Sequence, residues 1–421
     1  MVGIGGIGMS ALAQLYHAQG HTVSGSDREE SPVTALLREK GISVSIGEDV
    51  QHIPEGIHTL VFSDAVPEEN SERTYAREHS IPEYSYFDAV GALSKERFTI
   101  AVAGSHGKTT TAAMIVKILH DAGHVPTALI GSLVKDFGSN FLEGSDQGPF
   151  VVEACEYKDH ILKLSPNVLV VTNLEWDHTD YFTSFEQLKE TFITSIQSLP
   201  QDGALVLNLT SDIGKELAEY APCMVVDYTQ VNIPALSLIG KFNESNAQAA
   251  KTVSAIIAEE LEENSIDTSL TSFEGSWRRF EYIGAMPNGA AVYDDYAHHP
   301  TEIKATLRAV RDIHKDKKII VAFHPHLYSR THDLMSEFST AFEDADEVIV
   351  APIYPAREEP IEGVTNESLA KAITEQGTKA THGTFDEVAQ HFKERDESDV
   401  VLITMGAGDI YKVAQQLVKQ S

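Results

Sequence analysis

The stretch G-S-H-G-K-T-T at Gly104–Thr110 constrains this chain more than any other part of its sequence. An apolar run, FTIAVAG, precedes it, and a helix-like run, TTAAMIVKILHDAG, overlaps its end. A glycine turn between a buried strand and a helix N-terminus presents backbone N–H groups to an anion, and Lys108 adds a positive charge. Thr109 is placed to ligate Mg²⁺. The motif therefore predicts a loop that binds the phosphates of ATP within an α/β domain.

This loop departs from the standard pattern at one position. The standard loop has a glycine six residues before its lysine, and Val102 stands there instead. The loop is thus the shortened G-x-x-G-K-T form. A chance glycine turn is the alternative, but the strand, the loop, the Lys-Thr-Thr run and the helix all agree with phosphate binding.

A second glycine loop, G-x-G-x-x-G at Gly3–Gly8, lies at the start of the sequence, with Asp27 about twenty residues further on. That spacing is typical of a dinucleotide-binding loop, in which the acidic residue lies near a ribose. The loop suits any pyrophosphate, including that of a nucleotide sugar. Only Met1 and Val2 precede the first glycine, so we expect the first strand to be clipped.

Short apolar runs alternate with helical stretches along the chain, which predicts parallel sheets. A chain of 421 residues is also too long for one core. We therefore expect an α/β protein of three domains in series. These are an N-terminal Rossmann-like domain at 1–95, a central P-loop ATPase-like domain at 96–283 and a C-terminal Rossmann-like domain at 284–421.

The composition excludes several classes of partner. With 32 basic and 63 acidic residues the formal net charge is −31, so the surface would repel nucleic acid and anionic membranes. No apolar segment approaches the length of a membrane span, so we expect no membrane insertion. The two cysteines, Cys155 and Cys223, do not provide a disulfide framework, which indicates a cytoplasmic protein.

Acidic and histidine side chains follow two predicted strands downstream of the phosphate loop. Glu153 ends the run FVVEA, and His178 closes TNLEWDH, which follows the run NVLVV. Residues at the carboxyl ends of parallel strands surround the ligand crevice, so both are expected to join Thr109 around Mg²⁺. The alternative is that Glu153 and Glu156 are solvated surface carboxylates.

A further cluster of polar residues lies in the last third of the chain. The run DDYAHHPTEI has adjacent histidines, but no cysteine or spaced histidine accompanies them, so zinc is not favoured. An acid, an aromatic residue and a histidine before a proline-started helix suit phosphate or nucleotide contacts better. Basic and histidine side chains near other strand ends complete the set: Arg278, His326, Arg330 and Arg357.

Taken in order, these motifs resemble those of the Mur ligase family, which builds the peptidoglycan peptide. The resemblance covers essentially the whole chain. It is carried by VGIGGIGMSALAQL, VSGSD, GSHGKTTT, VVEACEY, TNLEWDH, GKFNESNAQAA, FEGSWRRFE, DDYAHHPTEI, PHLYSRT and MGAGDI. Within the family, GIGGIGMS, DDYAHHPTEI and MGAGDI point to the alanine-adding type.

The resemblance implies a cytoplasmic ligase, monomeric or homodimeric, that uses ATP and Mg²⁺ in peptidoglycan precursor synthesis. It would join L-alanine to the carboxylate of UDP-N-acetylmuramate through an acyl phosphate. The first domain would bind the UDP-sugar, the second ATP, and the third would help to bind nucleotide and amino acid.

The resemblance also assigns residues to each ligand. ATP would be bound by Gly104, Ser105, His106, Gly107, Lys108, Thr109, Thr110, Asn243, Asn246, Arg278 and His298. The UDP-sugar would be bound by Gly5, Gly6, Gly8, Ser10, Asp27, Ser63, His106 and Asn173. The amino acid would contact His326, Arg330 and Arg357; the metal ligands would be Thr109, Glu153 and His178; and the catalytic residues would be Lys108, Glu153, His178 and Arg330.

Three positions depart from the family pattern. Phe242 stands where a histidine is common, which favours contact with adenine by stacking. Leu327 replaces a usual arginine and so removes one charged contact, and Ile193 stands where some sister ligases carry a modified lysine.

Other functions remain alternatives at this point. A sister ligase adding D-glutamate or a recycled tripeptide would share most motifs. A folylpolyglutamate-type ligase would not need the N-terminal GIGGIGMS segment. An NAD(P)-binding oxidoreductase or regulator would leave GSHGKTT unexplained, and a noncatalytic ATP-binding scaffold would not need Lys108, Glu153 and His178 together.

Overall fold

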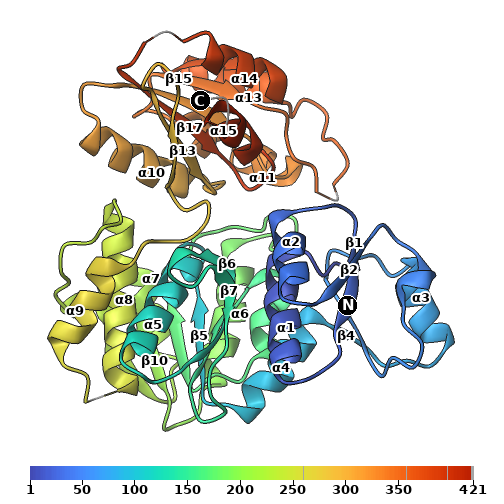
Figure 1. The fold of residues 1–421 in the computed structure, drawn as a ribbon. Coiled ribbons are helices and arrows are strands. Elements are labelled where there is room, and N and C mark those ends of the chain that lie inside the picture. Colours follow the sequence, from blue (N-terminus) through green and yellow to red (C-terminus); the bar gives the residue numbers. More distant parts are fainter. Residues whose placement is uncertain (259, 357, 396, 419–421) are drawn as a thin grey trace. The chain divides into compact units, whose positions relative to one another are not determined.

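The computed structural model describes residues 1–418 except 259, 357 and 396 (Figure 1). The predicted α/β class is confirmed, and the chain folds as two compact units. The first contains Met1–Leu174, Leu188–Ser237 and Ser245–Glu274, and the second contains Glu175–Gln187, Leu238–Glu244 and Gly275–Ser421. The borders expected for three domains stay a prediction, because the second unit takes two short segments from the central third of the chain.

Two short parallel strand pairs form the sheet layer of the N-terminal segment. β1 (Ser24–Asp27) pairs with β2 (Ser43–Ile46), and β3 (Leu60–Phe62) pairs with β4 (Glu83–Ser85). Val2 bridges both Ser26 and Phe62, so this residue links the two pairs. The helices are α1 (Ile7–Ala18), α2 (Pro32–Glu39), α3 (Ser71–Glu78) and α4 (Tyr86–Glu96).

Local chemistry explains where these helices begin. Ser31 caps α2 through the Thr34 N–H, and Pro32 occupies its first turn, where a missing N–H costs no hydrogen bond. Ser85 and Asp88 form a reciprocal capping box at the start of α4. These residues stabilise the turns that follow β1 and β4 on the sheet's carboxyl side.

The central segment forms a seven-stranded sheet in the order β11-β10-β9-β5-β8-β6-β7, parallel except for the β6–β7 hairpin. Its strands are β5 (Thr99–Ala103), β6 (Thr127–Val134), β7 (Ser139–Leu142), β8 (Phe150–Glu153), β9 (Val168–Val171), β10 (Ala204–Leu207) and β11 (Met224–Asp227). Its helices are α5 (Lys108–Asp121), α6 (Phe185–Gln197), α7 (Asp212–Ala218), α8 (Lys241–Ile257) and α9 (Glu263–Ser272). The central strand β5 is buried along its whole length, as expected for a parallel strand covered on both faces.

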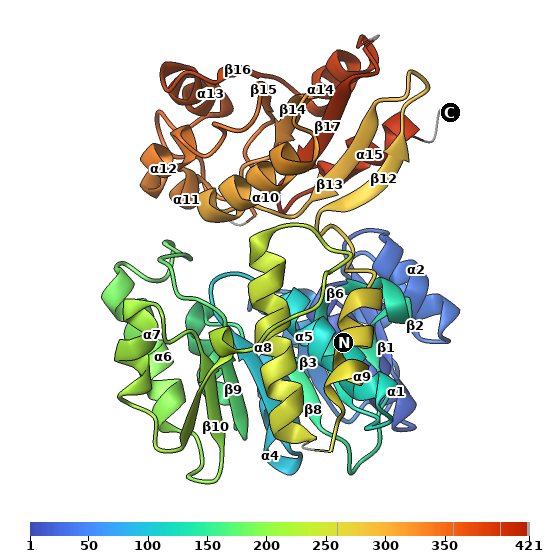
Figure 2. The same cartoon turned by 90° about the vertical axis from the view of Figure 1, so that its left-hand side faces the viewer.

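The last segment forms a six-stranded sheet in the order β12-β13-β17-β14-β15-β16, parallel except for β12 with β13 (Figure 2). Its strands are β12 (Glu281–Ala285), β13 (Ala291–Asp295), β14 (Lys318–Phe323), β15 (Glu347–Val350), β16 (Lys379–His382) and β17 (Val400–Met405). Its helices are α10 (Pro300–Ile313), α11 (Tyr328–Asp333), α12 (Met335–Ser339), α13 (Asn366–Glu375), α14 (Phe385–Lys393) and α15 (Tyr411–Val418).

Alternate residues of β14 serve two separate cores in this segment. Val321 packs in the core formed with α10, α12 and α13, whereas Ile320 and Ala322 pack in the core formed with α14 and α15. Because successive strand side chains point to opposite faces, one strand supports both helical layers. This is the doubly wound arrangement, which places ligand crevices at the carboxyl ends of the strands.

A buried polar network joins α1 to the β7 hairpin inside the first unit. The Asn140 side chain donates to Ser10 Oγ at 2.8 Å and accepts from the Gln14 amide at 2.9 Å. Ser139 donates to Gln14 Oε1 at 3.0 Å. All four side chains are buried and hydrogen-bonded to one another, so this contact fixes the first glycine loop's helix against the central sheet.

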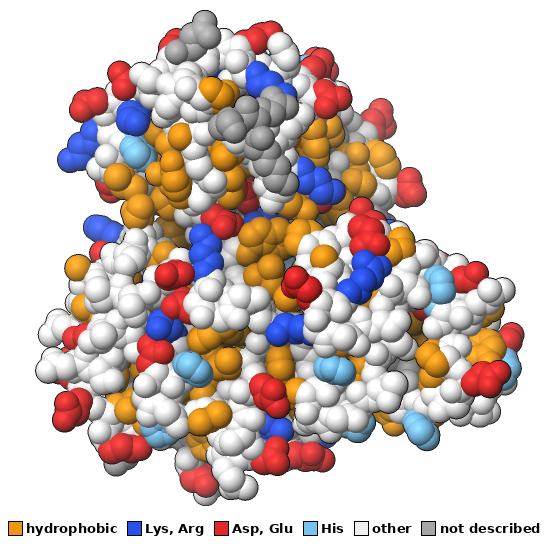
Figure 3. Space-filling model, in the orientation of Figure 1, with side chains coloured by type: hydrophobic (Ala, Val, Ile, Leu, Met, Phe, Trp, Pro, Cys, Tyr) orange, Lys and Arg blue, Asp and Glu red, His pale blue; other side chains and the backbone are white. Residues whose placement is uncertain are grey.

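The face of the molecule drawn in Figure 3 carries acidic side chains in many separate places rather than in one patch. This distribution agrees with a general solubilising role for the excess negative charge. Over the described part of the chain, no helix is both long and apolar enough to cross a membrane.

Candidate active site

The phosphate loop follows β5 and runs into α5, as the sequence predicts. Gly104 and Gly107 have φ values of 125° and 84°, a region that favours glycine. A Cβ atom at Gly104 would collide with Thr172, and one at Gly107 would collide with Asn246. Both glycines are therefore required by backbone geometry and by the close approach of neighbouring segments.

Two side chains from the end of β9 clamp the loop at His106. The His106 N–H donates to Asn173 Oδ1 at 2.9 Å, and the His106 carbonyl accepts from Asn173 Nδ2 at 2.9 Å. Thr172 Oγ1 donates to the same carbonyl at 2.6 Å. The structure thus places Asn173, expected at the UDP-sugar, against the phosphate loop. Its position one residue after the apolar run NVLVVT was the sequence signal for this contact.

The Lys108 ammonium lies inside the loop and pairs with a buried carboxylate. Its Nζ is 3.0 and 3.1 Å from the two oxygens of Glu156 and donates to the carbonyls of Gly104 and Ser105. Burial alone would lower the pKa of Lys108, but Glu156 raises it above its usual value, so the ammonium stays charged. With a side chain that is 1% exposed, Glu156 is not a solvated surface carboxylate, and that interpretation was wrong.

Two of the three predicted metal ligands meet beside the loop. Thr109 Oγ1 donates to Glu153 Oε2 at 3.0 Å, and the other carboxylate oxygen of Glu153 accepts from the Gly131 N–H. A hydroxyl and a carboxylate are hard oxygen ligands of the kind that Mg²⁺ prefers. These residues therefore fit a magnesium ion bound next to ATP phosphates. His178 belongs to the second unit.

The first glycine loop brings together most of the residues expected at the UDP-sugar. The Gly5 N–H donates to Asp27 Oδ2 at 2.8 Å, and a Cβ at Gly5 would lie 2.9 Å from that oxygen. A Cβ at Gly8 would lie 2.8 Å from the Tyr86 ring, and one at Gly3 would lie 3.0 Å from Ser63 Cβ. Ser10, in contrast, is buried in the α1–β7 network, where its hydroxyl donates to the Ile7 carbonyl.

In the second unit, Arg330 forms the centre of a buried cluster with Asp177 and His326. Its Nε and Nη2 atoms donate to Asp177 Oδ1 at 2.8 and 2.6 Å, and Nη1 lies 3.0 Å from His326 Nδ1. The rings of His298 and His326 are 5.9 Å apart. The structure therefore brings together three of the predicted residues, while Arg357 lies outside the described residues.

The protonation states in this cluster follow from burial. Burial lowers the pKa of His298 to about 4 and that of His326 well below its usual value, so both rings are neutral at pH 7. Burial alone would raise the pKa of Asp177, but the Arg330 guanidinium holds it well below its usual value. Sequence reasoning missed Asp177, although an acid directly before His178 at a strand end was a usable signal.

Arg278, which the sequence predicts to contact ATP, is buried in the structure. Its guanidinium donates to Asp294 Oδ2 at 2.7 Å and to the carbonyls of Gly406 and Gly408. The side chain also lies against the Tyr411 ring, 4.8 Å from its centroid. These contacts hold the MGAGDI loop after β17, and direct contact with ATP stays a prediction.

The remaining predicted residues divide between the two units. Asn246 lies beside the phosphate loop, where Oδ1 accepts from Thr111 Oγ1 at 3.2 Å. Asn243 belongs to the second unit and donates to the Ile239 carbonyl at 2.7 Å. Leu327 is buried at the start of α11, which agrees with the loss of a charged contact at that position.

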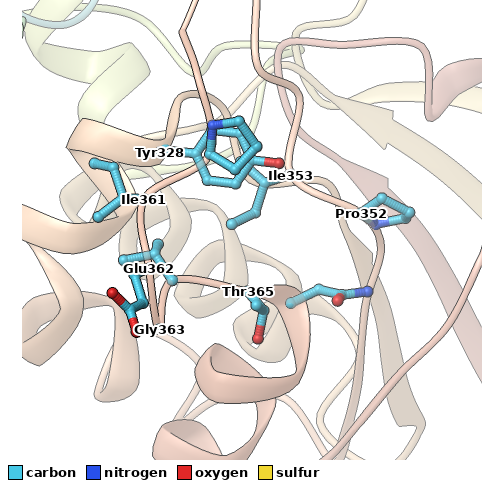
Figure 4. A pocket seen from close by; sticks show the side chains of 10 residues that line it. Tyr328, Pro352, Ile353, Ile361, Glu362, Gly363 and Thr365 are labelled. Atoms are coloured by element: carbon cyan, nitrogen blue, oxygen red, sulfur yellow. The ribbon is translucent and has the colours of Figure 1, made fainter.

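A pocket of about 460 Å³ opens between the loop after β15 and the start of α13 (Figure 4). Tyr328, the second residue before Arg330, contributes to its wall, together with Ile353 and Ile361. Glu362 and Asn366 add polar atoms. The pocket therefore offers a mostly apolar space close in sequence to the residues predicted for the amino acid.

Family models match most of this chain in the same order as its segments. The Mur ligase family catalytic domain matches residues 1–98, the Mur ligase middle domain 102–236, and the Mur ligase glutamate ligase domain 278–408. The fold and the two glycine loops agree with this class of protein. The chain belongs to the Mur ligase family.

Individual relatives show which members of the family this chain is similar to. It is 36% identical over 452 residues to the UDP-N-acetylmuramate–L-alanine ligase of Caldicellulosiruptor saccharolyticus, covering 100% of this chain and 98% of the relative. It is 34% identical to the ligase of that name from Clostridium acetobutylicum, covering 100% and 97%. The crystal structure of UDP-N-acetylmuramate–alanine ligase from Thermotoga maritima matches with a TM-score of 0.81 at 25% identity, covering 100% and 97%. A murein peptide ligase from Psychrobacter arcticus shares the fold, with a TM-score of 0.76, 22% identity and coverage of 99% and 97%.

Proposed function

We propose that this chain catalyses the ATP-dependent joining of L-alanine to the carboxylate of UDP-N-acetylmuramate, a step of peptidoglycan precursor synthesis. The observation that carries the proposal is the phosphate loop with Lys108 inside it and the Thr109–Glu153 pair beside it. The names of the full-length relatives support the choice of substrates. We infer that the protein works in the cytoplasm as a monomer or homodimer.

The ligands would be distributed over the predicted residues. The first glycine loop, with Asp27 and Ser63, would bind the UDP moiety, and the phosphate loop would bind ATP. Thr109, Glu153 and His178 would hold Mg²⁺, which when bound supplies positive charge against the transferred phosphoryl group. Asn243, Asn246 and Arg278 would lie by the nucleotide, and His298, His326, Arg330 and Arg357 by the amino acid and phosphate.

The reaction would proceed in two balanced steps. The muramoyl carboxylate oxygen attacks the γ-phosphorus of ATP, the bond to the β-phosphate oxygen breaks, and ADP leaves. Lys108 stabilises the charge that spreads over the transferred group. The neutral alanine nitrogen then attacks the acyl carbon, the bond between that carbon and the phosphate oxygen breaks, and the amide forms as the nitrogen's proton leaves with the inorganic phosphate.

The amine must be neutral before this attack, because an ammonium has no lone pair. The cluster around Arg330 suits the amino acid, since the guanidinium can bind its carboxylate. The neutral imidazole of His298, whose Nδ1 faces the Tyr296 carbonyl, can accept a hydrogen bond from its nitrogen at Nε2, and the neutral ring of His326 adds no charge to repel it. This arrangement supports binding of a zwitterionic amino acid in the second unit.

Phosphate release from ATP tests the proposal directly. Purified protein receives Mg-ATP and UDP-N-acetylmuramate while each amino acid, and the recycled tripeptide, is offered in turn. We expect release only with L-alanine, together with a product whose mass equals that of the alanyl conjugate. Release with D-glutamate or the tripeptide instead would favour a sister ligase, and release with none would defeat the proposal.

A further inference from the structure

Glu156 has an unusual place for a carboxylate. It follows β8, its side chain is 1% exposed, and both of its oxygens lie within 3.1 Å of the Lys108 ammonium. A buried negative charge next to a loop that binds phosphates opposes the binding of those phosphates. The carboxylate is therefore expected to weaken nucleotide binding, and an effect on the position of Lys108 would offset that cost.

The hydrogen bonds of Lys108 indicate how Glu156 acts on this ammonium group. An ammonium group has three protons, and three acceptor groups surround this one: the carbonyls of Gly104 and Ser105 and the Glu156 carboxylate. A phosphate oxygen can bind Lys108 only by displacing one of them. The two carbonyls are part of the loop backbone, so Glu156 is the acceptor whose side chain can rotate away.

The backbone behind Glu156 is held firmly in place. Lys158 and Asp159 adopt left-handed conformations, with φ values of 52° and 58°, which persist only when surrounding contacts enforce them. The Asp159 carboxylate accepts a hydrogen bond from a threonine hydroxyl of α6 at 2.6 Å. The buried His160 ring stacks on Phe87 with centroids 3.8 Å apart. These contacts hold the backbone that follows Glu156, so we expect exchange at Lys108 to move the Glu156 side chain rather than this backbone.

We propose that Glu156 is a positioning residue for phosphoryl transfer, which holds the Lys108 ammonium in the loop and gives way to a phosphate oxygen of ATP. The inference rests on the proposed ATP-dependent ligation. While Glu156 is in contact, its two oxygens hold the Lys108 ammonium within the loop. Once a phosphate takes its place, the ammonium is already positioned for the transferred group, and no rearrangement of the loop is required.

The variant Glu156→Gln tests this, because it should strengthen ATP binding and slow the reaction at the same time. Glutamine keeps the shape but competes more weakly for the ammonium, so the Kd for Mg-ATP should fall on the order of threefold to tenfold. Because Lys108 is then less well directed, kcat should also fall, by about tenfold. Calorimetric titration with Mg-ATP alone and the phosphate-release assay give the two values.

Each other combination overturns the proposal. Weaker ATP binding with a lower kcat would mean that Glu156 serves only the fold. Tighter binding without loss of kcat would mean simple charge repulsion, and unchanged values would mean no role. The control Glu216→Gln removes a lysine–carboxylate pair of the same unit, Lys189–Glu216 at 2.8 Å, and should leave both values unchanged.

A second variant keeps the test decisive if Glu156→Gln is unstable. Glu156→Asp retains the charge but is one methylene shorter, so Kd should stay near that of the unaltered protein while kcat falls; a normal kcat would overturn the proposal. The titration arm does not depend on the sugar or amino acid. If the unaltered protein failed to release phosphate with any amino acid, the proposed function would fall while the Mg-ATP result would still judge Glu156.

Discussion

The two glycine loops of the first unit differ in the charged side chains that lie within and behind them. Each leads into a helix, α1 or α5, and contains glycines at which an added Cβ would collide with neighbouring atoms. The loop at Gly104–Thr110 contains Lys108 and is backed by the carboxylates of Glu153 and Glu156. The loop at Gly3–Gly8 has no lysine or arginine, and its Gly5 N–H donates to the Asp27 carboxylate.

This difference indicates which loop suits a diphosphate that is only bound and which one suits a phosphoryl group that is transferred. A diphosphate that is only held needs backbone N–H groups at a helix N-terminus. A phosphoryl group in transfer spreads negative charge over its oxygens and needs a positioned cation. The first loop therefore suits a substrate that stays intact, and the second suits the nucleotide that reacts.

Removal of the lysine should give the largest effect and separate the two loops. We expect Lys108→Ala to lower the rate of phosphate release by on the order of 10³-fold or more, with UDP-N-acetylmuramate binding retained. The phosphate-release assay and calorimetric titration measure the two. Lys117→Ala is the matched control, because this lysine lies on the same helix and pairs with Asp121 at 2.8 Å. Near-normal activity of Lys108→Ala would break the comparison.

A methyl group in the first loop should affect the other substrate alone. The Cβ of Gly5→Ala would lie 2.8 Å from Thr34 Cγ2 and 2.9 Å from Asp27 Oδ2. We expect the KM for UDP-N-acetylmuramate to rise on the order of tenfold to a hundredfold, because the loop must shift, with the Kd for Mg-ATP unchanged. Gly20→Ala is the control for backbone strain alone: its φ is 86° and nothing lies within 4 Å of the added Cβ, so stability should fall while both substrate constants stay unchanged. An effect of Gly5→Ala on ATP alone would contradict the assignment of the loops.

Asn173 holds the phosphate loop through two hydrogen bonds to the His106 backbone. Asn173→Ala removes two hydrogen bonds to the His106 backbone, so we expect the KM for ATP to rise about tenfold. The free energy of unfolding should fall by about 1–2 kcal/mol. Asn167→Ala is matched, because Asn167 Oδ1 accepts from the Thr99 N–H at 2.9 Å, away from the loop. It should lower stability without changing the KM for ATP, and a rise in the KM for the UDP-sugar with Asn173→Ala would restore the earlier expectation.

Mild acid should act on the second unit through His298. Burial lowers the pKa of this imidazole to about 4, whereas an unfolded histidine titrates near 6.5. Between about pH 6.5 and 4 the unfolded chain therefore binds a proton at this position and the folded chain does not. The free energy of unfolding falls as the pH drops through this range. We expect the free energy of unfolding, measured in urea, to fall by roughly 1–3 kcal/mol more in the unaltered protein than in His298→Asn, in which the buried His326 still contributes to the acid dependence. An equal slope in that variant would exclude His298 as the cause.

The sequence predicted the elements of the site better than their arrangement. The glycine spacing of both loops, the apolar strand before the phosphate loop and the Lys108–Thr109 pair are contiguous in sequence, so local propensity and backbone geometry decide them. The predicted meeting of Thr109 and Glu153 also followed from a rule, because the carboxyl ends of neighbouring parallel strands share an edge. No such rule applies to the contacts expected of Asn243 with the nucleotide and of Arg357 with the amino acid, and both stay predictions.

The sequence by itself determined the α/β class, the two loops and the family. Only the tertiary structure decided that Ser10 is buried in a network with β7, that Asn173 clamps the phosphate loop and that Arg278 holds the MGAGDI loop. It also decided that Glu156 is buried against Lys108. The physical reason is common to all four: each contact joins residues far apart in the chain, and whether a polar side chain finds a partner there depends on strand order and burial rather than on its neighbours in sequence.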